Sequence, residues 1–315
     1  MADAFDVITM GRSGVDVYPE QIGVSLVDVT TFAKALGGSA TNVAVASARY
    51  GWRTALISRT GADPFGEYVH KALGEFHIDD RWVTTVAAYP TPVTFCEIFP
   101  PDNFPIYFYR YPKAPDLEIY PEELDLDAIA AASVFWTTGT GLSREPSRSA
   151  TLAALEARDR RSITIHDLDF RPMFWPSVAD ATEWQREALS HASVAVGNLD
   201  EVEVAVGTRD PQQAADALLD LGVSLAIVKQ GPAGVLARTR NSSVVVPPVQ
   251  IEVVNGLGAG DAFGGALCHG LLSGWELERT VRFANAAGAL VASRLLCSAA
   301  MPYAPDVEKL LEGGN

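Results

Sequence analysis

Short apolar segments rich in β-branched residues alternate along the chain with longer segments in which apolar residues recur every three or four positions. The short segments, each ending in glycine or a polar residue, are 5–11, 54–61, 133–139, 162–167, 193–198 and 224–231. The longer segments between them are 39–51, 64–76, 146–159, 182–192 and 211–222. The first pattern is typical of strands and the second of amphipathic helices. Their alternation predicts an α/β fold with a mostly parallel sheet covered by helices on both faces.

Residues 91–111 interrupt this alternation. The strand-like runs TPVTFCEIF and IYFYRY flank PPDNFP, which has the composition of a turn, so the segment is predicted to be a hairpin. A simple edge hairpin would explain the pattern. We favour a flap over a ligand site, because the hairpin is rich in Phe, Tyr and Arg. No repeat or linker divides the chain, and we expect a single domain over residues 1–315.

The charge balance limits the partners that the protein can bind. The chain of 315 residues carries 39 acidic and 24 basic residues, a formal net charge of −15. This charge repels nucleic acids and anionic membranes, so an anionic substrate must be held by a few placed arginines. Neither a secretory signal nor an apolar run long enough to span a membrane is evident, and Cys96, Cys268 and Cys297 lack zinc-site spacing. We therefore expect a cytoplasmic protein.

The segment NGLGAGDAFGGAL (255–267) joins a glycine-rich turn to a helical pattern. Gly258, Ala259 and Gly260 fall at the predicted helix N-terminus, where free N–H groups and the helix dipole form an anion pocket. Asp261 follows in the first turn. A carboxylate in this position can simply stabilise a helix start. Beside an anion pocket it can also accept the proton of an attacking hydroxyl, which is what an alcohol kinase requires.

Other nucleotide-binding classes do not match the sequence. It contains no GxxxxGK[ST] motif, which excludes a P-loop kinase, and no protein-kinase motifs. The glycine-rich loop lies near the C-terminus, whereas the dinucleotide-binding fingerprint should follow the first strand.

An ordered set of motifs resembles the ribokinase-like, or PfkB, carbohydrate kinases over nearly the whole chain. The motifs are GGSATNVAVASARYG (37–51), RTGADPFGEYV (59–69), DLDFRPMFW (167–175), GNLDEVEV (197–204) and NGLGAGDAFGGAL (255–267). The resemblance implies a three-layer αβα sandwich with a small β lid, which we assign to about 16–33 and 91–113. It also implies ATP-dependent phosphorylation of a sugar hydroxyl with Mg²⁺.

Carried over by position, the resemblance makes Asp261 the catalytic base and residues 258–260 the anion hole. Asn198 and Glu201 match an N-x-x-E element whose oxygens suit Mg²⁺ held through water, and a solvated surface Glu is the alternative.

The nucleotide side of the site is also implied by the resemblance. Lys229 and Gly231 match a strand-end turn beside the nucleotide phosphates, where the lysine could neutralise charge. Asn285 falls where the family lines the adenine pocket, although it could equally be a packing contact. Asn255 and Gly256 replace the usual Asp and Thr, so a requirement for a monovalent cation stays open.

The sugar side is predicted from residues near the first strand and the following helix. Asp16 can accept hydrogen bonds from two sugar hydroxyls, Gly37 and Gly38 allow close approach, and Asn42 lies one turn into the helix. Ser39 could at the same time start that helix as its N-cap.

Arginine placement favours an acidic sugar. Arg171 follows a predicted strand end and Arg110 lies on the hairpin, and two guanidinium groups converging on one cleft would bind a carboxylate. An exposed strand arginine is more often only solvated. The residues alone therefore support a sugar or sugar-acid kinase.

Three alternatives remain at this point: a related kinase for 2-dehydro-3-deoxygluconate or fructose, a non-catalytic sugar or nucleotide sensor, and a dinucleotide-dependent oxidoreductase. A lid hairpin exposes a strand edge that a second copy could cover, so a homodimer through the lid is possible.

Overall fold

A nine-stranded sheet forms the centre of the protein in the computed structural model, which describes residues 4–160 and 162–313. The strand order is β13-β12-β11-β10-β9-β8-β1-β4-β5. Its strands are β1 (Val7–Met10), β4 (Thr54–Gly61), β5 (Asp79–Val86), β8 (Val134–Thr138), β9 (Ile163–Asp167), β10 (Val194–Asn198), β11 (Leu225–Lys229), β12 (Val235–Arg238) and β13 (Ser243–Val246). All six predicted strands are present and pair in parallel with one another, which confirms the mostly parallel sheet.

Three strands were not predicted. β5 pairs in parallel with β4, whereas β12 and β13 add an antiparallel ribbon beside β11. Each of these strands has at least one half-exposed or exposed position and lies at or near an edge of the sheet. They therefore lack the continuous apolar run that marks a strand buried on both faces.

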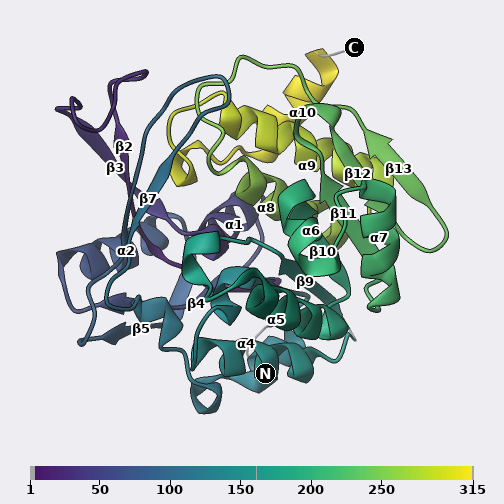
Figure 1. Ribbon diagram of the computed structural model, residues 1–315, viewed down its shortest axis with the longest axis horizontal. Helices are drawn as coiled ribbons and strands as arrows, with labels where there is room; N and C mark the ends of the chain where they lie inside the picture. The colour runs from purple at the N-terminus through teal and green to yellow at the C-terminus, as the bar shows by residue number, and fades with distance from the viewer. Residues whose placement is uncertain (1–3, 161, 314–315) are drawn as a thin grey trace.

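Helices cover both faces of this sheet, so the protein has three layers (Figure 1). On one face lie α1 (Ser39–Arg49), α2 (Pro64–Glu75), α8 (Ala259–Leu272), α9 (Leu277–Ala292) and α10 (Ala304–Gly313). On the other lie α3 (Leu126–Ala131), α4 (Ser147–Arg158), α5 (Val178–His191), α6 (Leu199–Val206) and α7 (Pro211–Asp220).

The buried strands supply side chains to both layers. On β8, Trp136 packs into the α1 and α8 side while Phe135 packs into the α3 to α5 side, because successive residues of a strand point to opposite faces. The predicted αβα sandwich is confirmed. Within the described ranges, no helix combines the length and the apolar character needed to cross a bilayer.

A second sheet of four strands, order β3-β2-β6-β7, projects from the main body (Figure 1). It contains β2 (Gly14–Pro19), β3 (Phe32–Gly37), β6 (Val93–Cys96) and β7 (Ile106–Tyr109). β6 and β7 pair antiparallel, which confirms the hairpin predicted at 91–111. The chain passes from β1 in the main sheet to β2 in the second sheet through only residues 11–13. The two sheets are therefore joined by a very short link close to the N-terminus.

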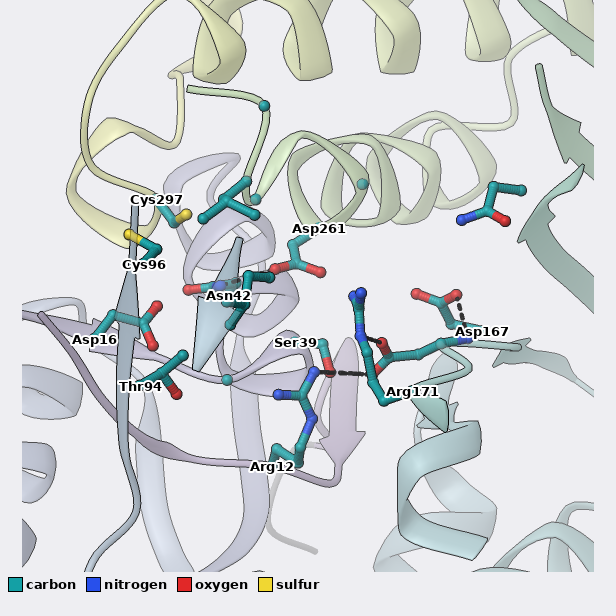
Figure 2. Close-up of a pocket in the computed structure, with 18 of the residues that line it drawn as sticks. Arg12, Asp16, Ser39, Asn42, Thr94, Cys96, Asp167, Arg171, Asp261 and Cys297 are labelled. Atoms are coloured by element: carbon teal, nitrogen blue, oxygen red, sulfur yellow. Dashed lines mark hydrogen bonds and ion pairs between the residues drawn. The ribbon is translucent and has the colours of Figure 1, made fainter. Parts of the chain in front are cut away.

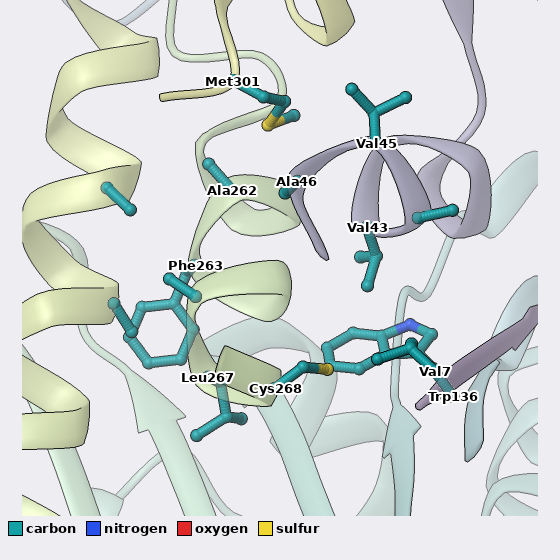
Figure 3. Close-up of a cluster of buried hydrophobic side chains, with 14 of the residues drawn as sticks. Val7, Val43, Val45, Ala46, Trp136, Ala262, Phe263, Leu267, Cys268 and Met301 are labelled. Carbon is teal, nitrogen blue, oxygen red and sulfur yellow. The ribbon is translucent and has the colours of Figure 1, made fainter. Parts of the chain in front are cut away.

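Two adjacent glycines explain how closely α8 packs against the centre of the molecule (Figure 3). A Cβ atom on Gly264 would lie 2.6 Å from the indole of Trp136, and one on Gly265 would lie 2.3 Å from the Cβ of Ala46 on α1. Side chains at these positions would push the helix outward. The paired glycines of the motif thus set the depth at which α8 sits, and with it the position of the helix N-terminus.

We expect Gly265→Val to lower the free energy of unfolding by about 2–3 kcal/mol, because an overpacked core must shift backbone or side chains. Urea unfolding followed by circular dichroism measures this change. Gly74→Val is the matched control, since Gly74 is an exposed residue of α2 with no atom near its would-be Cβ, and its effect should stay within about 0.5 kcal/mol. Equal effects of the two substitutions would contradict the packing explanation.

Candidate active site

A cavity of about 460 Å³ lies where the carboxyl ends of β9, β10 and β11 meet the second sheet (Figure 2). Ligands in α/β proteins bind at this end of the strands. Many of the predicted site residues line it: Asp16, Gly38, Asn42, Arg171, Asn198, Glu201, Lys229, Gly231, Gly258, Gly260 and Asp261. The structure therefore brings together segments from almost the whole length of the chain.

Asp261 lies in the first turn of α8 and faces the cavity (Figure 2). Its Oδ2 accepts a hydrogen bond of 2.8 Å from Nδ2 of Asn42 on α1. The residue before the helix, Gly258, has φ of +79° and supplies no side-chain cap, so the first backbone N–H groups of α8 remain free for an anion.

Asp16 and Asp261, the two carboxylates expected on the sugar side, both have raised pKa values. Loss of hydration in the cavity raises the pKa of Asp261 to about 6, while the Asn42 hydrogen bond opposes the shift. Burial likewise raises the pKa of Asp16 to about 6, although its hydrogen bond from the Tyr18 hydroxyl, 3.0 Å long, works in the other direction. A carboxylate with such a pKa is still mostly ionised at pH 7 but is a stronger base than an ordinary aspartate.

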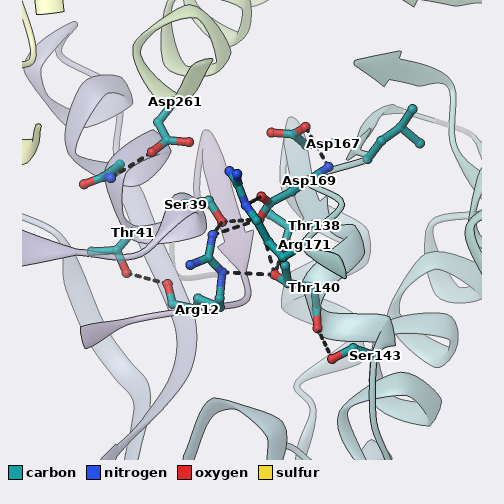
Figure 4. A network of polar contacts seen from close by, with 12 residues as sticks. Arg12, Ser39, Thr41, Thr138, Thr140, Ser143, Asp167, Asp169, Arg171 and Asp261 are labelled. Atoms are coloured by element: carbon teal, nitrogen blue, oxygen red, sulfur yellow. Dashed lines mark hydrogen bonds and ion pairs between the residues drawn. The ribbon is translucent and has the colours of Figure 1, made fainter. Parts of the chain in front are cut away.

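A second cluster is built around Asp169, which follows β9 (Figure 4). Its Oδ2 accepts hydrogen bonds from Arg12 Nη2 at 3.0 Å and from the Ser39 hydroxyl at 2.8 Å, and its Oδ1 accepts one from Arg171 Nε at 3.0 Å. Burial alone would raise the pKa of Asp169, but the charges of Arg12 and Arg171 outweigh it and hold the pKa well below its usual range. One carboxylate is thus shared by two guanidinium groups, which leaves one positive charge over.

The opposite wall of the cavity contains Asp167, Glu201 and Lys229. Burial raises the pKa of Asp167, and the charge of Lys229 acts against this rise. Burial would lower the pKa of Lys229, but the surrounding carboxylates outweigh that effect and raise it. The lysine therefore stays charged in a buried place, where it could meet a phosphate.

Asn198 and Glu201 form a capping box at the start of α6. Asn198 Oδ1 accepts hydrogen bonds from the backbone N–H groups of Asp200 and Glu201, and Glu201 Oε2 accepts one of 2.7 Å from the Asn198 N–H. Glu201 is only 6% exposed, so the alternative of a solvated surface residue is wrong. No residue in the described part of the chain donates to the other carboxylate oxygen, Oε1, which leaves it for a ligand.

These oxygens fit a magnesium ion that is held mainly by water and phosphate. Among the described residues, no cluster of three or more His, Cys, Asp or Glu side chains is arranged to hold a metal. Magnesium in phosphoryl-transfer sites typically uses one or two carboxylates and completes its shell with water and substrate oxygens. Glu201 and Asp167 supply such donors beside Lys229.

Two predicted site residues lie elsewhere. Arg110 forms a buried ion pair of 2.7 Å with Asp116 and does not line the cavity, so the expected convergence of Arg110 and Arg171 on one cleft is not seen. Asn285 donates a hydrogen bond of 2.7 Å to the backbone carbonyl of Pro247, which is the packing contact named as its alternative. Asn285 does not line the cavity either.

Gly37 and Ala259 support the site without lining it, whereas Ser39 lines it. A Cβ on Gly37 would lie 2.2 Å from the Asp16 carboxyl group, so this glycine makes room for that side chain. Ala259 is the first residue of α8 and does not line the cavity. Ser39 is not the N-cap of α1, because that position belongs to Gly38 and the Ser39 hydroxyl is used by Asp169.

Asn255 has a structural role in this protein. It is fully buried, its Nδ2 donates to the carbonyl of Leu295 at 2.7 Å, and its Oδ1 accepts from the N–H of Leu257 at 3.0 Å. Both ends of the amide are therefore occupied in fixing the glycine-rich loop.

Sequence reasoning missed Arg12 and Asp169. Asp169 stands within the motif at 167–175, whereas Arg12 follows the first strand, outside the five motifs. The available signal was a charged side chain just after each of two distant strands. That the two side chains form a buried pair depends on the strand order, which brings the two strand ends together.

Comparison with known proteins places these observations in context. The model for the pfkB family of carbohydrate kinases matches residues 5–304. A protein of Photobacterium profundum named 5-dehydro-2-deoxygluconokinase is 35% identical over 305 residues, which cover 94% of this chain and 92% of that protein. A protein of the same name from Geobacillus kaustophilus is 30% identical over 314 residues, 98% of this chain and 93% of the relative.

Solved structures show the same fold. A protein of E. coli named as a ribokinase II, crystallised with ATP and Mg²⁺, aligns with a TM-score of 0.88 over 98% of this chain and 99% of its own, at 21% sequence identity. At this sequence identity the likeness shows the fold alone, which is the ribokinase-like arrangement of three layers.

Proposed function

The chain belongs to the pfkB family of carbohydrate kinases, and we propose that it transfers the γ-phosphoryl group of ATP to the 6-hydroxyl of 5-dehydro-2-deoxy-D-gluconate, a step of myo-inositol catabolism. One observation carries the proposal of phosphoryl transfer: the Asp261 carboxylate lies in the cavity beside the free backbone N–H groups at the N-terminus of α8. The names of the relatives and the two arginines beside Asp169 support the sugar-acid part. A reaction that consumes ATP also supports a cytoplasmic location.

In this proposal Asp261 is the general base. Its raised pKa lets it accept the proton of the sugar hydroxyl, and the hydrogen bond from Asn42 fixes the carboxylate so that Oδ1 faces the substrate. Asp16 and Asn42 bind sugar hydroxyls, and Gly38 allows the sugar to approach the backbone. These contacts orient one hydroxyl toward the phosphate.

The N–H groups at 258–260 and Lys229 stabilise the negative charge that develops on the transferred group. The residues that would hold Mg²⁺ are Glu201 and Asp167, with Asn198 positioning Glu201. When bound, Mg²⁺ neutralises phosphate charge. Gly231 leaves space beside the phosphates, since no atom lies near its would-be Cβ.

We assign the second sheet, from about 16–33 and 91–113, as a lid on a single domain of residues 1–315. Ile106 and Phe108 on β7 line the cavity, while Tyr107 and Tyr109 on the same strand are 43% and 64% exposed. Closure of this lid would exclude water and prevent loss of the phosphoryl group to hydrolysis. The exposed tyrosines on an edge strand support a homodimer through the lid.

A phosphorylation screen with Mg-ATP tests the proposed substrate. We expect ADP release to be fastest with 5-dehydro-2-deoxy-D-gluconate and at least tenfold slower, in kcat/KM, with 2-dehydro-3-deoxygluconate and fructose. A preference for either of the latter would identify a different kinase of the family. ATP binding with no turnover of any sugar would identify a sensor.

We expect Asp261→Asn to lower kcat by about 10²- to 10⁴-fold, the contribution of a general base, with little change in sugar affinity measured by calorimetry. Asp127→Asn is the matched control because Asp127 is an exposed carboxylate in the first turn of α3. It should leave kcat unchanged. A fully active Asp261→Asn enzyme would remove the residue from the mechanism.

The pH dependence of kcat should follow the protonation of Asp261. The base must be ionised, so kcat at saturating sugar should fall about tenfold per pH unit below a pKa near 6 and level off above it. Asn42→Leu removes a hydrogen bond that lowers this pKa, so it should move the acidic limb to higher pH. A flat profile between pH 5 and 8, or a shift to lower pH in the variant, would contradict the assignment.

A further inference from the structure

We infer that Arg12, with Arg171 beside it, binds the carboxylate of the sugar acid and sets the preference for acids over neutral sugars. This inference rests on the proposed function and names the residue that recognises the substrate's charge. Arg12 lies in the short link between β1 and β2 and lines the cavity (Figure 2).

The guanidinium group of Arg12 is held in one orientation by two of its three nitrogens. Its Nε donates to the Thr140 hydroxyl at 3.2 Å, and its Nη2 donates to Ser39 and Asp169, both at 3.0 Å (Figure 4). Its Nη1 donates to no residue in the described ranges. Because the side chain is only 9% exposed, the remaining donor has few places to find a partner other than the cavity.

Aromatic rings enclose the same group. The Arg12 guanidinium carbon lies 5.6 Å from the ring centre of Phe108, on β7 of the second sheet, and 5.9 Å from that of Phe174. Such surroundings exclude water and so strengthen the attraction between the arginine and an anion. They leave Nη1 of Arg12 available, and together with the terminal amino groups of Arg171 it can make a two-point contact with a carboxylate.

The two arginines around Asp169 carry one positive charge more than that carboxylate balances, so a further anion can bind there. Arg12 and Arg171 share this single carboxylate, and beyond it neither forms another ion pair with a described residue. Toward the described residues, Arg171 donates through Nε alone, so its terminal amino groups also remain for a ligand. A buried cation and a partly exposed one with a single counter-ion are expected to favour a second negative group.

The other cations near the cavity are already neutralised. Arg110 is paired with Asp116, and Lys229 lies among Asp167, Glu201 and Asp261, whose charges raise its pKa. The charge of Arg12 acts to lower the pKa values of Asp16 and Asp261, but neither carboxylate forms an ion pair with it in the described structure.

The backbone of Asp169 supports a functional rather than a merely structural pairing. Its φ is +25°, a conformation that non-glycine residues rarely adopt. Strained residues of this kind persist where the surrounding structure fixes them and are concentrated at ligand sites. Here the side chain of the strained residue, Asp169, lies between Arg12 and Arg171, which come from different segments of the chain.

Binding of two ligands by calorimetry tests the inference: 5-dehydro-2-deoxy-D-gluconate and its C1 carboxamide, which has the same shape without the charge. We expect Arg12→Gln to weaken binding of the acid about 10- to 100-fold, as for loss of a charge-assisted hydrogen bond, and to change binding of the amide by less than about threefold. The discrimination between acid and amide should collapse.

Further variants keep the test decisive. Arg12→Lys retains the charge that balances Asp169, so the variant should fold. It should bind the acid with intermediate affinity, because an ammonium group lacks the planar, fixed donors of a guanidinium group. Arg279→Gln, at a 60% exposed arginine on α9, is the matched control and should behave as wild type. Thermal melting of each variant checks that the protein is folded.

The outcomes separate this inference from the proposed function. Equal losses for acid and amide in Arg12→Gln, or a loss of discrimination in Arg110→Gln alone, would overturn the role of Arg12. So would a wild-type protein that binds acid and amide equally. A wild-type protein that prefers the acid through Arg12 but phosphorylates no sugar acid would support the inference and refute the proposed activity.

Discussion

The close contact of α8 with α1 is the constraint on which the rest of the site depends. Gly264 and Gly265 remove the side chains that would separate α8 from Trp136 and Ala46. The same approach brings Asp261 on α8 within hydrogen-bonding distance of Asn42 on α1. A packing requirement in the core thus fixes the direction of a carboxylate at the surface of the cavity, and it does so from the same motif that supplies the helix N-terminus.

The site keeps several charges in a buried space by dividing them into two groups. Asp169 is shared by Arg12 and Arg171 on one side, and Lys229 lies among carboxylates on the other. Between them, Asp261 has a single neutral hydrogen-bond donor, and burial moves its pKa upward. The electrostatic environment is therefore different at each carboxylate, although all of them line one cavity.

The sequence was sufficient to predict the elements with strong local patterns. The six buried parallel strands, the hairpin at 91–111 and the start of α8 at residues 258–260 were all found from periodicity and glycine placement. Edge strands such as β13 were missed because exposed positions interrupt their apolar pattern. Residue contacts were harder to predict.

Side-chain contacts could not be predicted where they depend on how the segments are arranged in space. Arg110 was expected to face the ligand, but Asp116 neutralises it in a buried pair. Arg12 and Asp169 meet only because β1 and β9 both flank β8, which periodicity does not reveal.

The link of residues 11–13 adds a mechanical consequence. Since Arg12 lies in this link and belongs to neither sheet, a change in the angle between the two sheets would act on its pairing with Asp169. The proposed anion contact at Arg12 would in turn favour one angle over others.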